Sequence, residues 1–347
     1  MTDATNTPAQ TSLVDMAQGY FRGKVLCAAV RLGIADALGD NEKNLDDLAV
    51  AVAADPDALY RLLRTLASIG IVSEVAPTRF ALTPFGQPLR RDTPGTVWAS
   101  VVFWADLIAD SWTYLAECVR TGEKSGAAAV MEREGVKSRW AREPNAKAIF
   151  HAVFAEPSAD SMAPVAAAYD FSACRVVADL GGAGGGLLAA ILTAHKQTRG
   201  ILVDREGAIA EATHKLKAAG LSARCELSAG DLLEAVPSGA DVYVMQRVLH
   251  GYDDENAKRI LQNCRAAMSA GSRLLVIEAV LPSRVDHADP AIEKILMGDL
   301  NMLTVTGGRE RSEPEWASLL SSARLALRRI VSIPGATSCI VEAMPEE

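Results

Sequence analysis

The sequence predicts an α/β fold in which a doubly wound parallel sheet follows a mostly helical winged-helix domain. Three observations predict it. Apolar runs of strand length alternate with helical stretches from Cys174 onward, a glycine cluster lies where the first of these runs meets a helix, and residues 1–92 follow an order of helices and then a hairpin. The chain has 347 residues, of which 49% are apolar, so two domains with ordinary cores are expected.

Composition and charge argue against several classes of protein. The net charge of −8 is the reverse of the basic footprint that a phosphate backbone requires, so no nucleic acid partner is expected. The 6 cysteines and 5 histidines lack metal-ligand spacing, so neither a metal site nor a disulfide framework is expected. The N-terminus does not have the pattern of a signal peptide, and no apolar run is long enough to span a bilayer. We therefore expect a cytoplasmic protein with no membrane contact.

The first block of the chain is predicted to form helices followed by a hairpin. Residues 13–32 are apolar at helical spacing, Asn44 is placed to cap a short helix, and Asp55-Pro56 opens a third helix that ends at Gly70. Two short strands are expected next, at 71–75 and 79–82. This order is typical of a winged helix.

A winged helix can bind DNA or another protein. Residues 36–92 hold 9 acidic and 6 basic residues, a net charge of −3, which favours a protein partner over DNA. Residues 94–168 then alternate apolar and polar positions at helical spacing. The aromatic residues of this helical segment are either core residues or part of a ligand pocket.

From Cys174 onward the pattern changes to strands that alternate with helices. Strands are expected at 176–180, 200–204, 224–227, 242–246 and 274–279, with helices near 186–195, 206–219 and 254–269. The last helix opens with Asp253, Asp254 and Glu255, which suit the positive end of a helix dipole. This half is predicted to be a Rossmann-like, doubly wound domain.

A glycine cluster follows the first strand and its acidic residue, Asp179. Small residues at this point let a ligand approach the backbone, and the helix N-terminus behind them favours an anionic group. The frame Gly184 to Ala189 also fits the G-x-G-x-x-A pattern of dinucleotide sites, and Asp204 follows Gly184 by 20 residues. A nicotinamide cofactor therefore stays open, as does a tight turn without a ligand.

Further motifs follow the glycine cluster in order. The full set is Asp179 to Gly185, Asp204, Gly230 to Pro237, Val248 to Glu255, Glu278 to Pro282 and Gly307 to Arg311. Together they resemble the ordered motifs of the S-adenosylmethionine-dependent O-methyltransferases of the caffeate and hydroxyindole kind, the plant-type or class II family, in a bacterial small-molecule member. Residues 32–36 and 59–64 resemble that family's winged-helix dimerisation domain.

The resemblance implies a site and a domain plan. His250 would be the general base, and Glu278 and Glu310 would hold its imidazole. The expected cofactor contacts are Asp179, Gly181, Gly182, Gly184, Asp204, Asp231, Leu232, Gln246 and Tyr252. Helices that bear Phe150, Phe154, Met162, Met297 and Met302 would build the substrate pocket. The expected domains are 1–93 for dimerisation, 94–170 as a helical linker and 171–347 for the cofactor.

Taken alone, several of these residues fit simpler roles. A lone His250 is more often structural, Glu278 is equally compatible with a solvated strand end, and Glu310 beside two arginines favours a surface charge. The sequence also departs from the family pattern: Ala183 replaces a glycine of the loop, Gln246 a frequent lysine, and Gly251-Tyr252 the usual Asp-Trp. These departures concern the fine geometry of the cofactor site.

The expected function is that of a homodimeric O-methyltransferase of secondary metabolism. It would use S-adenosylmethionine and no metal to methylate a hydroxyl group of a small aromatic or polyketide-like compound. Three alternatives are kept: a nicotinamide-dependent oxidoreductase, a relative that binds the same cofactor but performs hydroxylation or decarboxylation, and a ligand-responsive winged-helix regulator.

Overall fold

The computed structural model describes residues 8–123, 126–133, 135, 137–154, 159–286 and 289–346. The chain forms two compact units: Met1–Asp110 with Lys137–Val153, and Ser111–Val136 with Phe154–Glu347. The segment 94–170, expected as a linker, is therefore divided between the two units. Its role as a separate functional segment, with boundaries at 93 and 170, stays a prediction.

The first unit begins with a long helix, which shorter helices and a small antiparallel sheet follow. Its elements are α1 (Pro8–Leu32), α2 (Ile34–Leu38), β1 (Lys43–Asn44), α3 (Leu45–Ala51), α4 (Pro56–Ser68), β2 (Val72–Ala76), β3 (Arg79–Leu82) and the 3₁₀ turn η1 (Gln87–Leu89). The strand order is β1-β3-β2. Side-chain caps start two helices, because Asn44 accepts a hydrogen bond from the Asp47 amide at 2.8 Å and Asp55 accepts one from the Ala58 amide at 2.9 Å. The predicted order of helices and then a hairpin is confirmed.

The middle of the chain is helical, as its pattern predicts. Its elements are α5 (Trp98–Val102), the π-helical turn η2 (Phe103–Leu107), α6 (Ala109–Thr113), α7 (Leu115–Thr121), α8 (Ala127–Arg133), α9 (Arg139–Arg142), α10 (Ala146–Phe154) and α11 (Ala159–Ala167). In the first unit, Phe103, Trp140 and Phe150 form an aromatic cluster whose rings meet edge to face with centroids 5.9 to 6.2 Å apart. This cluster joins η2, α9 and α10.

The second unit is built on a mixed sheet. Its strands are β4 (Val176–Leu180), β5 (Arg199–Asp204), β6 (Cys225–Ala229), β7 (Val242–Gln246), β8 (Arg273–Leu281), β9 (Arg311–Ser312), β10 (Leu325–Ser332) and β11 (Ser338–Pro345). The strand order is β10-β11-β8-β7-β4-β5-β6, with β9 beside β8. Strands β4 to β8 pair in parallel, whereas β11 runs antiparallel to β8 and β10 antiparallel to β11. The predicted parallel strands are confirmed, and the C-terminal antiparallel pair has no counterpart in the prediction.

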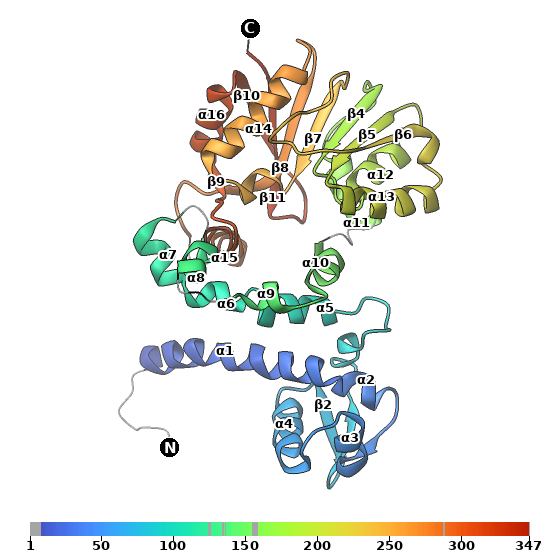
Figure 1. Cartoon of the computed structure of the whole chain (residues 1–347), viewed down its shortest axis with the longest axis vertical. Helices are drawn as coiled ribbons and strands as arrows, with labels where there is room; N and C mark the ends of the chain where they lie inside the picture. Colours follow the sequence, from blue (N-terminus) through green and yellow to red (C-terminus); the bar gives the residue numbers. More distant parts are fainter. Residues whose placement is uncertain are drawn as a thin grey trace. The chain divides into compact units, whose positions relative to one another are not determined.

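Helices cover both faces of this sheet, as Figure 1 shows. The helices and short turns of this part of the chain are α12 (Gly186–Ala194), α13 (Glu206–Ala218), η3 (Ser222–Arg224), η4 (Leu249–Gly251), α14 (Asp254–Ala267), α15 (Pro290–Val305) and α16 (Glu313–Ser322). Helices α12 and α13 pack on one face of the sheet and α14 and α16 on the other, whereas α15 lies beside α7 and α8. Along β7, Tyr243 packs in the hydrophobic cluster that contains Leu261 of α14, and the next residue, Val244, packs in the cluster that contains Leu188 of α12. Successive strand residues therefore pack in apolar layers on opposite faces of the sheet. This explains why the sequences of these strands are continuously apolar.

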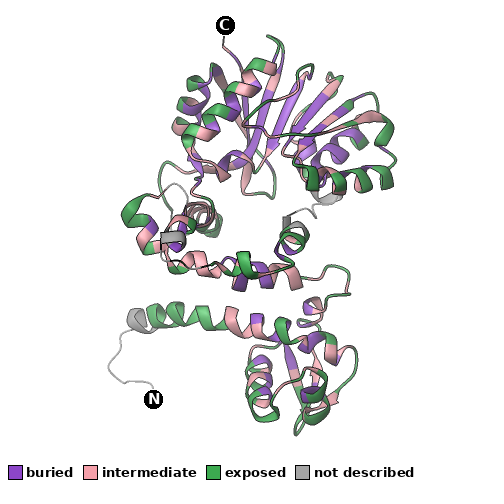
Figure 2. Cartoon of the chain, in the orientation of Figure 1, coloured by how far each residue is buried: buried purple, intermediate pink, exposed green. Residues whose placement is uncertain are grey.

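Burial is uneven between the elements (Figure 2). The strands of the large sheet are mostly buried, whereas the first half of α1 exposes large apolar side chains, with Leu13 65%, Met16 76% and Phe21 63% exposed. Within the described residues, no helix combines the length and the apolar character needed to cross a bilayer.

Candidate functional site

The carboxyl ends of the parallel strands define the candidate site. Strand β4 ends at Leu180, β5 at Asp204 and β7 at Gln246, and these three strands are neighbours in the sheet. The chain runs from β4 outward to β5 and β6 on one side and then returns to β7 on the other. Open α/β sheets bind ligands at such a reversal of strand order.

The glycine loop after β4 is tightly packed. Gly181 has φ +74°, and a Cβ added there would lie 2.7 Å from Cγ2 of Val248. A Cβ on Gly182 would lie 2.6 Å from Cγ of Asp179. Ala183, the departure from the family pattern, takes a φ of +46°, which a non-glycine residue rarely adopts. The loop then reaches the N-terminus of α12 through buried Gly184, so it exposes backbone rather than side chains to a ligand.

Asp179 is fully enclosed at the end of β4. It is 1% exposed, and within the described part of the chain neither of its carboxylate oxygens has a hydrogen bond of ordinary geometry. Burial raises the pKa of Asp179 to about 7; the nearby charge of Asp204 adds to the increase, and the Leu188 amide opposes it. A buried carboxylate without partners needs a donor or a cation from elsewhere.

The other expected cofactor residues lie at neighbouring strand ends. Asp204 is half-buried and accepts hydrogen bonds from the amides of Ala183 at 2.8 Å and Arg205 at 2.6 Å. Asp231 follows β6 and accepts a bond from the Leu233 amide at 2.9 Å, in a turn. The remaining three differ in burial: Leu232 is buried in the core cluster, and Gln246 and Tyr252 are half-buried.

These groups match a ligand that carries several hydrogen-bond donors. Two acids, Asp179 and Asp204, lie against the glycine loop, and within the described chain Asp179 accepts no hydrogen bond of ordinary geometry. Ribose hydroxyls and an amino group are donors of the required kind. S-adenosylmethionine has both, so the residues at this edge fit the cofactor that the family resemblance implies.

A second cluster, of His250, Glu278 and Glu310, lies at the same edge of the sheet. Nδ1 of His250 is 2.8 Å from Oε1 of Glu310, and the two residues are 8% and 6% exposed. Glu278 uses Oε1 to accept bonds from the amides of Val248 at 3.0 Å and His250 at 3.2 Å. The resemblance assigns both acids to the imidazole; in the structure Glu310 contacts the ring, whereas Glu278 contacts the backbone of the turn η4.

Local structure holds this cluster in place. Asp253 caps α14 by accepting a bond from the Asn256 amide at 2.9 Å, which fixes the turn after His250. The Glu310 amide donates to Oδ1 of Asp299 on α15 at 2.8 Å. Burial raises the pKa of Glu278; the positive charge of a protonated His250 opposes the increase, and Glu310 adds to it. Asp299 carries no signal in the sequence that marks it as part of the site.

This arrangement suits proton transfer. When Glu310 is ionised it accepts a bond from Nδ1–H, so Nε2 keeps its lone pair and can accept a proton. One oxygen each of Glu278 and Glu310 is buried without a partner in the described chain. Each of the three residues also offers one atom that could coordinate a metal ion, and these atoms lie within 4.8 Å of one another. The expected absence of a metal therefore stays a prediction.

The expected substrate-pocket residues fall in different places. Met162 packs against the core cluster behind the large sheet, which gives it a role in packing. Phe150 belongs to the aromatic cluster of the first unit and is 42% exposed. On α15, Met297 is exposed and Met302 is half-buried. The side chain of Phe154 lies outside the described residues.

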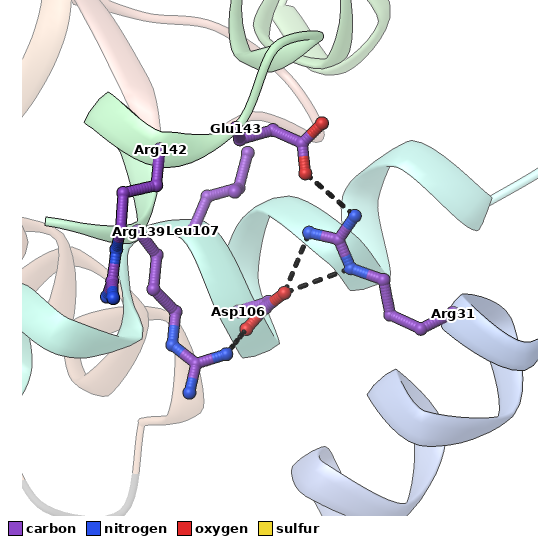
Figure 3. A pocket seen from close by; sticks show the side chains of 6 residues that line it. All are labelled: Arg31, Asp106, Leu107, Arg139, Arg142 and Glu143. Atoms are coloured by element: carbon purple, nitrogen blue, oxygen red, sulfur yellow. Dashed lines mark hydrogen bonds and ion pairs between the residues drawn. The ribbon is translucent and has the colours of Figure 1, made fainter.

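Sequence reasoning missed a charged pocket of about 330 Å³ in the first unit. Figure 3 shows Asp106 between Arg31 and Arg139, with Glu143 also bound to Arg31. Burial opposes ionisation of Asp106, but the hydrogen bond from Arg31 and the charge of Arg139 lower its pKa overall. The residues come from α1, η2 and α9, so no local motif could reveal the network. It joins these three helical segments by ion pairs.

Comparison with known proteins gives two family matches. An O-methyltransferase domain model matches residues 112–325, and an O-methyltransferase dimerisation domain model matches residues 14–91. Among curated relatives, O-demethylpuromycin-O-methyltransferase of Streptomyces alboniger is 35% identical over 97% of this chain and 89% of its own length. Phenazine O-methyltransferase PhzM of Lysobacter antibioticus is 35% identical over 97% of each chain. A phenazine-1-carboxylate N-methyltransferase of Pseudomonas aeruginosa is 30% identical over 98% of each.

Solved structures agree with these matches. The crystal structure of LaPhzM covers 98% of this chain and 100% of its own with a TM-score of 0.85 and 35% identity. An O-methyltransferase from neocarzinostatin biosynthesis, in complex with S-adenosylmethionine and 2-hydroxy-5-methyl naphthoic acid, is 32% identical, covers 93% of this chain and 96% of its own, and has a TM-score of 0.77.

Proposed function

Because the chain belongs to the plant-type O-methyltransferase family, we propose that it transfers a methyl group to a hydroxyl group of a small aromatic or polyketide-like metabolite. It is an S-adenosylmethionine-dependent methyltransferase of small aromatic metabolites. The choice of oxygen as the acceptor atom is the proposal. The observation that carries it is the buried pair of His250 and Glu310, joined at 2.8 Å.

A hydroxyl acceptor has a use for this pair. A phenol has a pKa of about 10, so at neutral pH its oxygen still carries its proton and a nearby base accelerates the attack. Nε2 of His250 accepts the proton, and the carboxylate of Glu310 stabilises the imidazolium that forms. Glu278 holds the turn through the amides of Val248 and His250. Once the acceptor is bound, the base is therefore already oriented.

The cofactor is assigned to the cradle at the ends of β4 and β5. When bound, S-adenosylmethionine supplies an electrophilic methyl group on a sulfonium sulfur. Asp204 is placed to accept hydrogen bonds from ribose hydroxyls. Asp179 is placed to pair with a cation, or to accept a hydrogen bond from a donor, near the glycine loop. Asp231, Leu232, Gln246 and Tyr252 are proposed to border the adenosine.

Nitrogen is the alternative acceptor, because one relative is a phenazine-1-carboxylate N-methyltransferase and another an 8-amino-8-demethylriboflavin N,N-dimethyltransferase. A neutral ring nitrogen or amino group has a free lone pair and needs no base to remove a proton before it attacks. A buried, carboxylate-oriented histidine is therefore better explained by a hydroxyl acceptor.

A homodimer is part of the proposal. Residues 14–91 match a dimerisation domain, and α1 exposes Leu13, Val14, Met16, Tyr20 and Phe21. Monomeric soluble proteins seldom leave such a patch in water, so a second copy of the chain is its proposed partner.

Product analysis tests the acceptor atom directly. The purified protein is incubated with S-adenosylmethionine that carries a ¹³C methyl group and with matched aromatic acceptors that present either a hydroxyl or a nitrogen. We expect a ¹³C signal at the chemical shift of an O-methyl group. Signals only at N-methyl shifts would replace the proposal with N-methylation.

A further inference from the structure

We propose that Arg311 is a positioning residue that sets the placement of His250 against Glu310. This inference rests on the proposed function of His250 as the base. Arg311 is only 1% exposed, and buried arginines are rare unless their donors are satisfied. Its contacts extend to each part of the chain that carries the proton-transfer cluster.

The guanidinium of Arg311 contacts the turn η4 on both sides of His250. Nη1 donates to the carbonyl of Leu249 at 3.2 Å, and Nη2 donates to the carbonyl of Tyr252 at 3.1 Å. One residue precedes His250 and the other follows it by two positions. A rigid, planar group that holds both carbonyls restricts where the imidazole can lie.

The same side chain is anchored to α14 and α16. Nε and Nη2 both donate to Oδ1 of Asp254, at 3.0 and 2.8 Å, in the first turn of α14. The guanidinium also lies 5.5 Å from the ring centroid of Trp316, which is completely buried on α16. These contacts fix the orientation of Arg311 from two sides.

The backbone around Arg311 contacts the two acids. Glu310, its neighbour in sequence, bonds the imidazole, and Arg311 pairs in β9 with Val280 of β8, two residues beyond Glu278. Nη1 of Arg311 also donates to the carbonyl of Arg309 at 3.3 Å, which closes the loop around Glu310. Arg311 is therefore tied to the segments of all three residues of the cluster.

Charge gives Arg311 a second effect on the cluster. Glu278 and Glu310 are both buried, and two buried carboxylates repel each other. Burial raises the pKa of Glu278 most, and the positive charge of Arg311 is among the influences that oppose this increase. The positive charge of the guanidinium thus partly offsets the unfavourable burial of the Glu278 carboxylate.

The test compares substitutions of Arg311 with a matched control. Arg311→Gln removes the contacts and the charge, and Arg311→Lys keeps the charge. Asp254→Ala removes the anchor, since both bonds from Arg311 go to its Oδ1. The side chain of Asp254 is 58% exposed, so this change leaves the core intact. The control is Arg224→Gln. Arg224 likewise donates to the carbonyls of Leu192, His195, Lys196 and Thr198, at the opposite edge of the sheet.

We expect Arg311→Gln to lower kcat about 100-fold, because small displacements of a catalytic group have effects of this order. Arg311→Lys should recover part of the loss, and Asp254→Ala should lower kcat by roughly a factor of 10. The KM for the acceptor and the affinity for S-adenosylhomocysteine should change less than kcat in all three. Asp179 and Asp204 of the cofactor cradle make no contact with Arg311, which is bonded to the backbone carbonyl of Tyr252 and not to its side chain. Arg224→Gln should lower the thermal midpoint and leave kcat unchanged. Native kcat in Arg311→Gln, or an equal loss of kcat in Arg224→Gln, would overturn the proposal.

Hydrogen–deuterium exchange gives a readout that does not depend on the reaction. Arg311→Gln should speed exchange in residues 247–254 and 308–311, whereas Arg224→Gln should leave these segments unchanged. If the native protein methylates no hydroxyl acceptor, the proposed function fails even when exchange follows this pattern. If the native protein does methylate a hydroxyl and exchange in Arg311→Gln is native, only the role of Arg311 is wrong.

Discussion

Gly308 packs directly against the backbone of His250: a Cβ added to Gly308 would lie 2.1 Å from the carbonyl oxygen of His250. The next amide, that of Arg309, donates to the same oxygen at 2.9 Å. The loop that carries Glu310 is therefore fitted to the turn that carries the histidine. This contact explains why a glycine is needed two residues before the acid.

Gly308→Ala should separate the two segments, because real Cβ atoms do not approach a backbone oxygen this closely. We expect turnover to fall at least about 10-fold through the displaced base. Gly271→Ala is the control, since a Cβ there meets nothing within 4 Å. Steady-state kinetics of the two variants test this prediction. If both variants turn over at the native rate, the loop adjusts to the added Cβ without any effect on the site.

Asp204→Ala should weaken binding of S-adenosylhomocysteine by about 1–3 kcal/mol, the range for a lost charge-assisted hydrogen bond. Calorimetry measures this directly. Asp241→Ala serves as the control, because Asp241 accepts from the amides of Arg175 and Val176 at the other edge of the sheet, at 2.7 and 2.9 Å. If both variants bind the nucleoside as tightly as the native chain, Asp204 does not contact the ribose.

Asp179 should make the stability of the cofactor-free protein depend on pH. Its pKa is raised to about 7 in the folded chain, whereas an unfolded aspartate titrates near 3.9. Between these values the folded state holds more protons than the unfolded state, so stability falls as pH rises from about 4 to about 7 and is then constant. The effect is at most about 4 kcal/mol.

Asp179→Asn should remove this dependence. The variant should therefore melt at a higher temperature than the native chain at pH 8 in the absence of cofactor, and bind S-adenosylhomocysteine more weakly, because the amide cannot neutralise a cation. Thermal melts across pH test the first part and calorimetry the second. A variant that melts lower at pH 8 would mean that Asp179 already has a favourable partner in the native chain.

The exposed face of α1 should make the protein dimeric. Light scattering should report about twice 36.8 kDa, and a double variant, Met16→Glu with Phe21→Glu, should shift the mass toward one chain. Val119→Glu is a suitable control, because Val119 is an exposed apolar residue on α7. A native protein that is monomeric at micromolar concentration would contradict the proposal.

The sequence predicted most accurately the elements that are determined by burial on both faces or by a local hydrogen bond. Strands β4 and β7 match their predicted ranges, because a parallel strand covered on both faces must be apolar throughout. The caps Asn44 and Asp55 were predictable for a similar reason, since a cap is a local hydrogen bond.

Other features depend on contacts between distant segments. Strand β10 contains Arg328 and Arg329, whose charges hide the strand pattern, yet Arg329 pairs with Glu342 on β11 at 2.6 Å. Glu310 has the local signature of a surface charge and is 6% exposed, because the turn with His250 and helix α15 cover it. Only the family resemblance pointed to its place in the site.

The rate of methyl transfer in His250→Gln tests the central claim most directly. The variant and the native chain are each saturated with S-adenosylmethionine and mixed with a hydroxyl acceptor, and the methylated product is followed by mass spectrometry in a single turnover. We predict a rate about 10²–10⁴-fold lower in the variant, with cofactor affinity nearly unchanged, because proton transfer and cofactor binding use different groups. An O-methylated product formed at the native rate by His250→Gln would contradict the account.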